Sequence, residues 1–353
     1  MKITVSPAYH KNNLGIVLAA DKNYVPYMAV TIASIHQNAE AGLNYDIIVL
    51  ADGITEEQKE QLRLYEAKNF SIRYVDVRQL LAGMDAGLFK SRGIWSMATC
   101  YRLFIPQLMP DYDKVLYLDC DILVKDSLKD LFAVDLSGFQ AGCVYDEVRY
   151  TAASDRVRDI TETIGLKDWR NYFNAGVVLF NIKEIKPQKF AKDFTEALQR
   201  PKLPFLDQDV LNILWQGKFK PLNGVWNYQY YTLIERPDLR GEKELAAAEK
   251  GRRIIHYITQ YKPWTNPELP HAGEWWLVAR GTPFYEEIIY KNTRTSYLLL
   301  RNLMQYRRLL CRYAGYKFLK SFSFGGWRRR LNDKVNELKR QVKQVRSVYR
   351  EKK

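Results

Sequence analysis

The sequence predicts an α/β fold with a mostly parallel central sheet that is covered by helices on both faces. Short apolar runs alternate with longer segments of helical spacing in the first half of the chain, and polar residues follow several of these runs. Parallel strands covered on both faces are apolar throughout, so this alternation favours a parallel arrangement. With 353 residues, 47% of them hydrophobic, the chain is long enough for one large α/β domain and an appendage.

Each expected element has its own signal. The expected strands are rich in apolar and β-branched residues, and they lie at residues 16–20, 45–51, 70–77, 114–118, 140–144, 176–181 and 254–257. Helical spacing marks the segments at 27–36, 54–68 and 101–108, of which the second opens with a capping sequence at Thr55. Four prolines predict an irregular link over residues 263–283. We therefore expect one domain over residues 1–282 and a helical tail over residues 283–353.

The net charge of +14 is concentrated at the end of the chain. Residues 291–353 contain 19 Lys and Arg against 3 Asp and Glu, a balance of +16, whereas residues 1–290 contain 35 against 37, a balance of −2. The body is therefore close to neutral, and the tail is the part suited to an acidic partner.

Apolar side chains are interleaved with the cations of the tail. They recur at intervals of 4, 3, 4, 3 and 4 residues at Leu331, Val335, Leu338, Val342, Val345 and Tyr349. Further apolar residues precede them beside arginines, at Leu298, Leu299, Leu300, Leu303, Met304, Leu309, Leu310, Phe322, Phe324 and Trp327. The pattern predicts basic amphipathic helices on an anionic membrane surface. The alternatives are a tail that packs on the body or pairs with another tail, and a nucleic-acid-binding segment, which the lack of a nucleic-acid motif disfavours.

Simple features argue against several other classes of protein. The four cysteines, Cys100, Cys120, Cys143 and Cys311, form no C-x-x-C pair, which argues against a disulfide framework and a zinc site. No apolar run reaches the length of about 18 residues that a membrane-spanning helix needs. Residues 1–15 lack the apolar core of a secretory signal. We therefore expect a cytoplasmic protein.

Two aspartates separated by one residue follow the apolar run at 114–118. In an extended chain Asp119 and Asp121 point to the same side, at the carboxyl end of a strand where α/β sheets bind ligands. Two carboxylates there suit Mg²⁺ or Mn²⁺ shared with substrate phosphates. A solvated acidic turn is the alternative for such a pair taken alone.

Four other segments carry polar residues, each of which has a functional and a structural interpretation. Arg102 is the cation of its helical segment, suited to a ligand or to an exposed ion pair. Asn174 stands before the strand at 176–181, where Gly176 permits close backbone approach. Asp207-Gln208-Asp209 opens an apolar helix and fits either a site or an N-cap. His256 ends a strand, as a structural residue or a metal ligand, and Lys262 follows as a candidate partner of a diphosphate.

Taken together and in chain order, these segments resemble glycosyltransferase family 8, which contains retaining galactosyl- and glucosyltransferases of bacterial lipopolysaccharide and also glycogenin. The matching segments are Ala19-Ala20-Asp21-Lys22-Asn23-Tyr24, Tyr101-Arg102-Leu103, Tyr117-Leu118-Asp119-Cys120-Asp121, Phe173-Asn174-Ala175-Gly176, Asp207-Gln208-Asp209 and His256 with Lys262-Pro263-Trp264. Each motif alone is weak, but their joint occurrence over residues 16–264 is specific. The resemblance implies a GT-A fold, a nucleotide-diphosphate-sugar donor and Mn²⁺, with Mg²⁺ as the alternative ion.

The resemblance also implies roles for individual residues. Asp119, Asp121 and His256 would bind the metal. Nucleotide-sugar contacts would come from Ala19, Ala20, Asp21, Asn23, Arg102, Asp119, Cys120, Asp121, Asn174, Ala175 and Lys262. Of these, Ala19, Asp21 and Asn23 would hold the uracil and ribose end. Asp146 would bind sugar hydroxyls, and Asp207 and Gln208 would lie beside the anomeric carbon. Two positions depart from the family pattern, Ile94 in place of a histidine and Thr259 in place of a glycine.

The implied activity is retaining transfer of glucose or galactose from a UDP-sugar to a glycan acceptor, lipopolysaccharide or another lipid-linked surface glycan, at the inner face of the cell membrane. Front-face attack by the acceptor hydroxyl is the mechanism we favour, and a double displacement through Asp207 stays open. The alternatives are a glycogenin-like protein glucosyltransferase and a nucleotide-sugar- or nucleic-acid-binding module without turnover.

Overall fold

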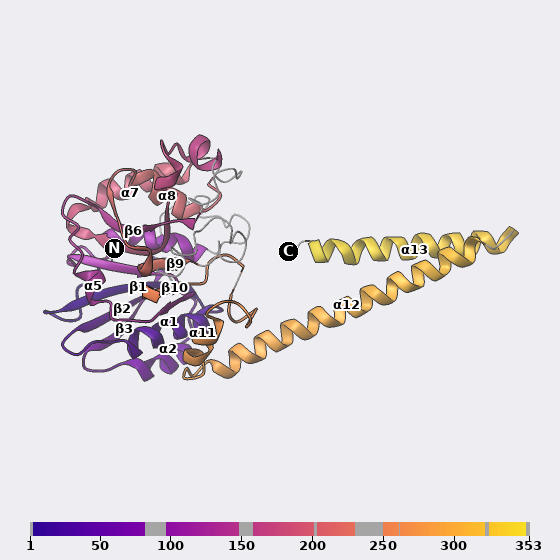
Figure 1. Cartoon of the computed structure of the whole chain (residues 1–353), viewed down its shortest axis with the longest axis horizontal. Coiled ribbons are helices and arrows are strands. Elements are labelled where there is room, and N and C mark those ends of the chain that lie inside the picture. Colours follow the sequence, from indigo (N-terminus) through magenta and orange to yellow (C-terminus); the bar gives the residue numbers. More distant parts are fainter. Residues whose placement is uncertain are drawn as a thin grey trace. The chain divides into compact units, whose positions relative to one another are not determined.

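The computed structural model describes residues 3–81, 97–147, 158–200, 203–229, 250–260, 262–321 and 325–350. The chain divides into two compact units, residues 1–286 and 287–353. The first unit contains the sheet and the candidate site residues, and the second contains two long helices (Figure 1).

The first unit is built on a seven-stranded sheet in the order β3-β2-β1-β4-β7-β6-β8. Its strands are β1 (Asn13–Asp21), β2 (Asn44–Asp52), β3 (Phe70–Asp76), β4 (Lys114–Leu118), β6 (Ala141–Tyr145), β7 (Phe173–Asn181) and β8 (Phe219–Pro221). β3, β2, β1 and β4 are parallel, β7 is antiparallel to both of its neighbours, and β8 is parallel to β6. The predicted mostly parallel sheet is confirmed.

Both faces of the sheet are covered. β1 and β2 each contain seven consecutive buried residues, so side chains that point to opposite faces are equally removed from water. On one face Val17 packs in a cluster with Leu103, Phe194 and Leu211 from the helical segments after β3 and β7. The helix that follows β1 also packs on that strand. The apolar runs in the sequence reflect this two-sided burial.

The helical segments match the expected positions with two differences. The α-helices of the first unit are α1 (Val25–Gln37), α2 (Glu56–Leu62), α3 (Val77–Leu81), α4 (Ile105–Leu108), α5 (Lys129–Phe132), α7 (Pro187–Leu198), α8 (Leu206–Leu214) and α11 (Ala272–Ala279). Shorter helical turns are η1 (Arg63–Tyr65), η3 (Met97–Phe104), η5 (Asp159–Ile164), η6 (Trp169–Asn171), η7 (Ile182–Glu184) and η8 (Gly224–Asn227). The helix expected at 54–68 ends at Leu62, although its capping box at Thr55 is present. The expectation of an irregular link at 263–283 is wrong, because α11 forms within it.

A second, three-stranded sheet brings distant segments to the carboxyl end of β4. Its strands are β5 (Ile122–Val124), β10 (Ile254–His256) and β9 (Tyr228–Gln229), with β10 in the middle. His256 pairs with Ile122 across β10 and β5, and the N–H of Tyr257 donates to the carbonyl of Asp121 at 3.0 Å. This pairing sets a histidine 135 positions downstream beside the aspartate that precedes β5.

Elsewhere in the first unit, the buried carboxylate of Asp46 connects β2 to β3 and to two other segments of the chain. Asp46 accepts hydrogen bonds from the Arg73 guanidinium at 2.7 Å, from the Tyr112 hydroxyl at 2.6 Å and from the Ala8 backbone N–H at 2.9 Å. The Asp46 side chain is fully buried, so these donors compensate a charge that is out of contact with water.

The second unit consists of α12 (Tyr285–Ser321), which begins at the end of the first unit, and α13 (Gly325–Arg350). Both helices lie in the segment for which the sequence predicts a basic helical tail. Of the residues named there, Phe322 and Phe324 lie outside the described part of the chain. Within the described residues, none of the helices combines the length and the apolarity that crossing a bilayer requires.

Candidate metal centre and the residues around it

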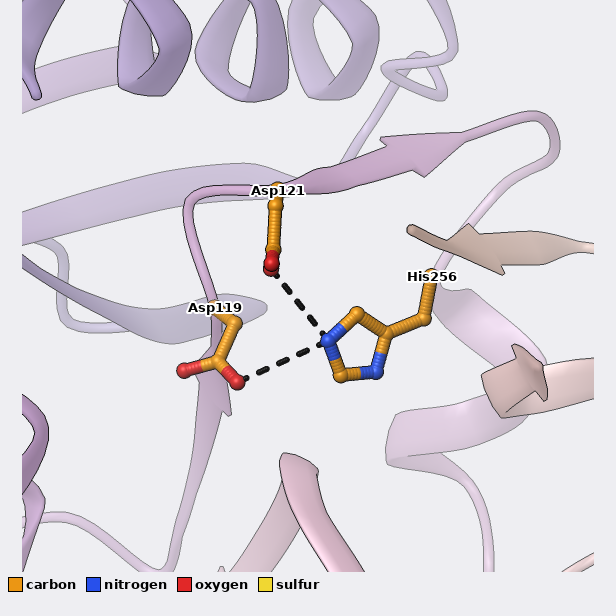
Figure 2. Close-up of side chains that lie close together, drawn as sticks. All are labelled: Asp119, Asp121 and His256. Carbon is orange, nitrogen blue, oxygen red and sulfur yellow. Dashed lines mark ion pairs between the residues drawn. The ribbon is translucent and has the colours of Figure 1, made fainter. Parts of the chain in front are cut away.

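Three potential ligands converge where the two sheets of the first unit meet. Asp119 follows β4, Asp121 precedes β5 and His256 ends β10, and their ligand atoms all lie within 4.8 Å of one another (Figure 2). Nε2 of His256 lies 3.6 Å from Oδ2 of Asp119 and 3.2 Å from Oδ1 of Asp121. The structure thus brings together the three residues that the sequence analysis assigned to a metal.

A buried amide orients the histidine. Nδ1 of His256 lies 2.9 Å from Oδ1 of Asn227, whose Nδ2 donates to Oδ1 of Asn174 at 2.9 Å. Since the amide donates through Nδ2, its Oδ1 is the acceptor for His256, and in the neutral imidazole the ring proton is on Nδ1. Nε2 then presents its lone pair to the two carboxylates, the arrangement typical of a metal-binding histidine.

The backbone leaves room for this cluster at one glycine. A Cβ on Gly176 would lie 2.1 Å from Cε1 of His256 and 2.7 Å from Oδ2 of Asp119, closer than any side chain can approach. The Gly176 carbonyl also accepts the N–H of Asp119 at 2.8 Å, so the two strand ends are tied at this point. Gly176 is therefore required for the close approach of His256 and Asp119.

The donor set fits a divalent metal. Oδ1 of Asp121 is buried without a hydrogen-bond partner, and it faces the Nε2 lone pair of His256. Such mutually repulsive acceptors are stabilised by a cation between them. Two carboxylates with one imidazole suit Mn²⁺ better than Mg²⁺, which prefers oxygen ligands and water.

Two cations balance the aspartates. The Lys262 ammonium contacts the carboxylate of Asp121 and the carbonyl of Tyr257. Burial by itself would raise the pKa of Asp121, but the positive charge of Lys262 beside it outweighs burial and holds that pKa well below its ordinary value. Asp121 therefore stays ionised and available to a metal across the physiological range.

The second cation, Arg102, joins the metal cluster to α8. It is only 3% exposed, and it lies 2.8 Å from Asp119 through Nη2 and 2.9 Å from Asp207 through Nε. Its guanidinium carbon also lies 4.2 Å from the centroid of the Tyr117 ring. The reading of Arg102 as an exposed ion pair is excluded by this burial.

Asp207 has an altered acidity in this setting. Burial raises its pKa to about 6, the Arg102 guanidinium opposes the rise, and the charge of Asp119 adds to it. Asp207 is thus ionised at neutral pH while held in the ion pair.

A hydrogen-bond network surrounds the neighbouring polar residues. The Gln208 amide donates to Oδ2 of Asp146 at 3.2 Å and to the Tyr172 hydroxyl at 3.1 Å, and it accepts the N–H of Ala175 at 2.9 Å. Asn174 donates to the same Asp146 oxygen at 3.1 Å. Through Asn174 and Asn227 the network continues to His256, so the polar side chains on β7 and α8 are positioned together with the metal cluster.

The segment at the end of β1 lies next to the acidic pair. Oδ1 of Asp21 accepts the backbone N–H of Asn23 at 2.7 Å, and Ala19 and Ala20 are buried. The buried Cys120 thiol donates to the carbonyl of Ala19 at 3.3 Å, which connects this segment to Asp119 and Asp121. These five residues therefore share the carboxyl edge of the sheet.

The two departures from the family pattern have different outcomes. Ile94 lies outside the described residues. Thr259 has a φ of +64°, the left-handed conformation that glycine adopts freely, so a β-branched residue stands at a backbone position that favours glycine. The buried Thr259 hydroxyl has no hydrogen-bond partner.

Asn227 and Tyr172 are site residues that the sequence analysis missed. Tyr172 donates to Asp209 and accepts from Gln208, and Asn227 bridges His256 and Asn174. Neither residue lies in a recognisable motif. Asn227 lies in the short η8 turn, where the sequence has no periodic pattern that would distinguish a site residue from a capping residue.

The comparisons with known proteins agree with this arrangement. Residues 15–268 match the family described as glycosyl transferase family 8. A putative glycosyltransferase of Haemophilus influenzae is 28% identical over 255 residues, which cover 71% of this chain and 73% of that protein. The lipopolysaccharide 1,3-galactosyltransferase of Salmonella typhimurium is 26% identical over 295 residues, which cover 82% of this chain and 84% of that protein.

Two solved structures extend the likeness to the fold. The galactosyltransferase LgtC, in complex with donor and acceptor sugar analogs, matches with a TM-score of 0.64 and 26% identity, covering 76% of this chain and 96% of that chain. The bifunctional glycosyltransferase WbbM in its apo form matches with a TM-score of 0.71 and 28% identity, covering 82% of this chain and 53% of that chain. The present chain therefore spans about half the length of WbbM.

The sheet, with its acidic pair at the carboxyl end of β4, defines a glycosyltransferase of the GT-A fold. The chain belongs to glycosyltransferase family 8, and it is a hexosyltransferase. Members of this family use a nucleotide-sugar donor, a glycan acceptor and a divalent metal. The resemblance stated from the motifs is confirmed.

Proposed function

We propose that this enzyme transfers glucose or galactose from a UDP-sugar to a glycan acceptor, with retention of the anomeric configuration and with Mn²⁺ as the metal. The observation that carries the proposal is the cluster of Asp119, Asp121 and His256, with a buried carboxylate oxygen that lacks a hydrogen bond. The family membership supplies the reaction class.

The nucleotide lies along the carboxyl edge of the sheet in this proposal. Ala19, Ala20, Asp21 and Asn23 contact the uracil and ribose end, and the Asp119-Cys120-Asp121 segment contacts the diphosphate end. The hydrogen bond between Cys120 and Ala19 supports one continuous binding surface.

Bond cleavage places negative charge on the diphosphate, and the chain has residues suited to receive it. When bound, Mn²⁺ acts as a Lewis acid on the leaving phosphate. Lys262 adds a positive charge from the other side of Asp121. Loss of Lys262 therefore lowers kcat/KM for the donor more than it weakens binding of the nucleoside.

The sugar is held by the network on β7 and α8. Asp146 binds donor hydroxyls, Asn174, Ala175 and Arg102 contact the donor from the same side, and Gln208 stabilises the oxocarbenium-like sugar. Asp207 lies 2.9 Å from Nε of Arg102, and this ion pair reduces its nucleophilicity. The contact favours front-face attack by the acceptor hydroxyl over a double displacement through Asp207.

The proposed acceptor is lipopolysaccharide or another lipid-linked surface glycan. The printed names of the Salmonella typhimurium relative and of a second relative in Escherichia coli, a lipopolysaccharide 1,2-glucosyltransferase, support this class. We place the enzyme in the cytoplasm at the inner face of the cell membrane. Residues 1–282 form the catalytic domain, and the basic tail at 283–353 binds anionic lipids.

A panel of nucleotide sugars tests the donor and the metal together. The purified chain is incubated with each UDP-hexose, with Mn²⁺, with Mg²⁺ or with a chelator, and release of UDP is measured. We expect hydrolysis of UDP-glucose or UDP-galactose that depends on Mn²⁺ and is lost in Asp121→Ala. The matched control is Asp113→Ala, an exposed aspartate near the start of β4, which should retain activity.

Three outcomes contradict parts of the proposal. Turnover by Asp121→Ala at ordinary metal concentration would remove the metal assignment. Binding of UDP-hexoses without any turnover would indicate a binding module. Labelled sugar attached to the chain itself would indicate a glycogenin-like enzyme.

A further inference from the structure

The two helices of the second unit pack against each other through one face of each. Lys320 of α12 donates to Asn332 of α13 at 2.6 Å, and Glu337 of α13 lies within the electrostatic influence of Arg312. Residue numbers that rise on one helix and fall on the other indicate an antiparallel hairpin. Val335 and Leu338, from the apolar stripe of α13, are buried in it.

The inner face of α12 has the matching spacing. Partly buried residues recur at intervals of 3, 4, 3 and 4 residues, at Tyr306, Leu309, Tyr313, Tyr316 and Lys320. Val335 and Leu338 of the α13 stripe therefore meet α12 and not an external surface. The expectation that this stripe faces lipid is wrong for Val335 and Leu338.

The outward faces of the two helices differ in chemistry. Among the described residues 328–342 of α13, every exposed side chain is charged or polar, at Arg328, Arg329, Arg330, Asp333, Asn336, Glu337, Lys339 and Arg340. On α12, Met304, Phe318 and Leu319 are 50%, 65% and 49% exposed. Met304, Cys311 and Phe318 are seven residues apart, so they form one line along the helix.

Arginines flank this apolar line. Arg307, Arg308 and Arg312 are exposed within one turn of Cys311. Apolar groups at the centre of a helix face and cations at its edges suit the boundary between acyl chains and anionic head groups.

We propose that the outer face of α12, centred on Met304, Cys311 and Phe318, is the surface that lies on an anionic lipid bilayer, while the outer face of α13 remains in water. The inference rests on the proposed membrane association of the tail and specifies the helix and the face. A second copy of the chain is disfavoured as the occupant, because two copies of residues 291–353, each with a charge of +16, repel each other. A nucleic acid is disfavoured because its phosphates offer no partner for the apolar line.

The chain contains a natural position for a probe. Cys311 is exposed, whereas Cys100, Cys120 and Cys143 are buried, so a thiol-reactive, polarity-sensitive fluorophore labels Cys311 selectively. The full-length chain is mixed with vesicles of phosphatidylglycerol or of phosphatidylcholine. We expect a blue shift with the anionic vesicles that decreases as salt is added, and little shift with the neutral ones.

A matched control moves the probe to the other helix. In Cys311→Ser with Asn336→Cys the fluorophore is on the outer face of α13, and its emission should stay that of a probe in water. Phe318→Ser should lower the vesicle partition coefficient about tenfold or more, since a phenyl ring is removed from the lipid. Helical content by circular dichroism verifies that each variant retains its helices.

The outcomes separate this proposal from the others. A shift at position 336 and none at 311 would reverse the assignment of the face. If the fluorophore emission were the same with and without vesicles at both positions, membrane association would be refuted. Dimers that form as the protein concentration rises would instead assign this face to a second copy of the chain. Hydrolysis of a UDP-hexose in the absence of vesicles tests the proposed function independently of all three.

Discussion

Replacing Asn227 by alanine tests how the metal cluster is held. Asn227 is 1% exposed and joins His256 to Asn174 through two hydrogen bonds of 2.9 Å each. Without the amide, His256 loses the acceptor for its Nδ1 proton, and the ring is free to rotate or to adopt the other tautomer. The other tautomer carries its proton on Nε2, which cannot then bind a metal.

The expected magnitude follows from the role of such partners. Residues that orient a metal-binding histidine typically change metal affinity by about 10- to 100-fold, or about 1.4–2.7 kcal/mol. Asn227→Asp should lose less affinity for the metal, because its carboxylate still accepts from Nδ1 of His256. It should nevertheless weaken donor binding, because an acceptor then faces Oδ1 of Asn174 and disturbs that side chain.

Titration calorimetry of the nucleotide-free chain with Mn²⁺ measures the effect directly. The matched control is Asn223→Ala, which removes the N-cap of the same η8 turn without touching His256. We expect this control to lower the melting temperature slightly and to leave metal affinity unchanged. A folded Asn227→Ala variant that binds Mn²⁺ like the natural chain would refute the reasoning, since the amide would then have no orienting role.

Three further predictions follow from single residues. Gly176→Ala should abolish detectable Mn²⁺ binding by calorimetry, because its methyl group would collide with His256. Asp46→Ala should lower the free energy of unfolding in urea by about 3 kcal/mol, the lower end for a buried pair, because Arg73 is 35% exposed and can reach water once unpaired. Asp207 takes up a proton as the pH falls through about 6, which weakens its pairing with Arg102, so kcat/KM for donor hydrolysis should fall below that pH.

Each of these predictions has a result that would contradict it. The control for Asp46→Ala is Asp193→Ala, which removes an exposed ion pair on α7 and should change the free energy of unfolding by less than about 1 kcal/mol. An equal loss of stability in the two variants would show that the buried Asp46 contributes no more than an exposed aspartate. Asp207→Asn should lose the acid limb of the pH profile, and an unchanged limb would assign it to another group. If a folded Gly176→Ala variant kept its Mn²⁺ affinity, the close approach of His256 and Asp119 at Gly176 would not be required for metal binding.

Most strands of the central sheet could be predicted from the sequence, because a strand that is buried on both faces has an apolar sequence. Continuous apolar runs such as 47–51 predicted strands, and β2 covers that range. The weaker expectations failed where tertiary contacts decide. The helix at 54–68 gives way to η1 after Leu62, and α11 forms among prolines that favoured a link, because its buried Trp275 and Ala279 pack into the domain.

The sequence by itself determined the family, the residue types of the site and the division of charge between body and tail, because motifs and charge counts depend only on the order of residues. It could not show that Asn227 orients His256 or that Arg102 joins Asp119 to Asp207, since these contacts depend on β10 pairing with β5 and on α8 reaching the end of β4. Tertiary structure also decided which side of the tail is exposed: pairing of α12 with α13 buries Val335 and Leu338, whereas Met304, Cys311 and Phe318 stay exposed. An apolar stripe read from sequence gives a periodicity, and only packing determines what that stripe contacts.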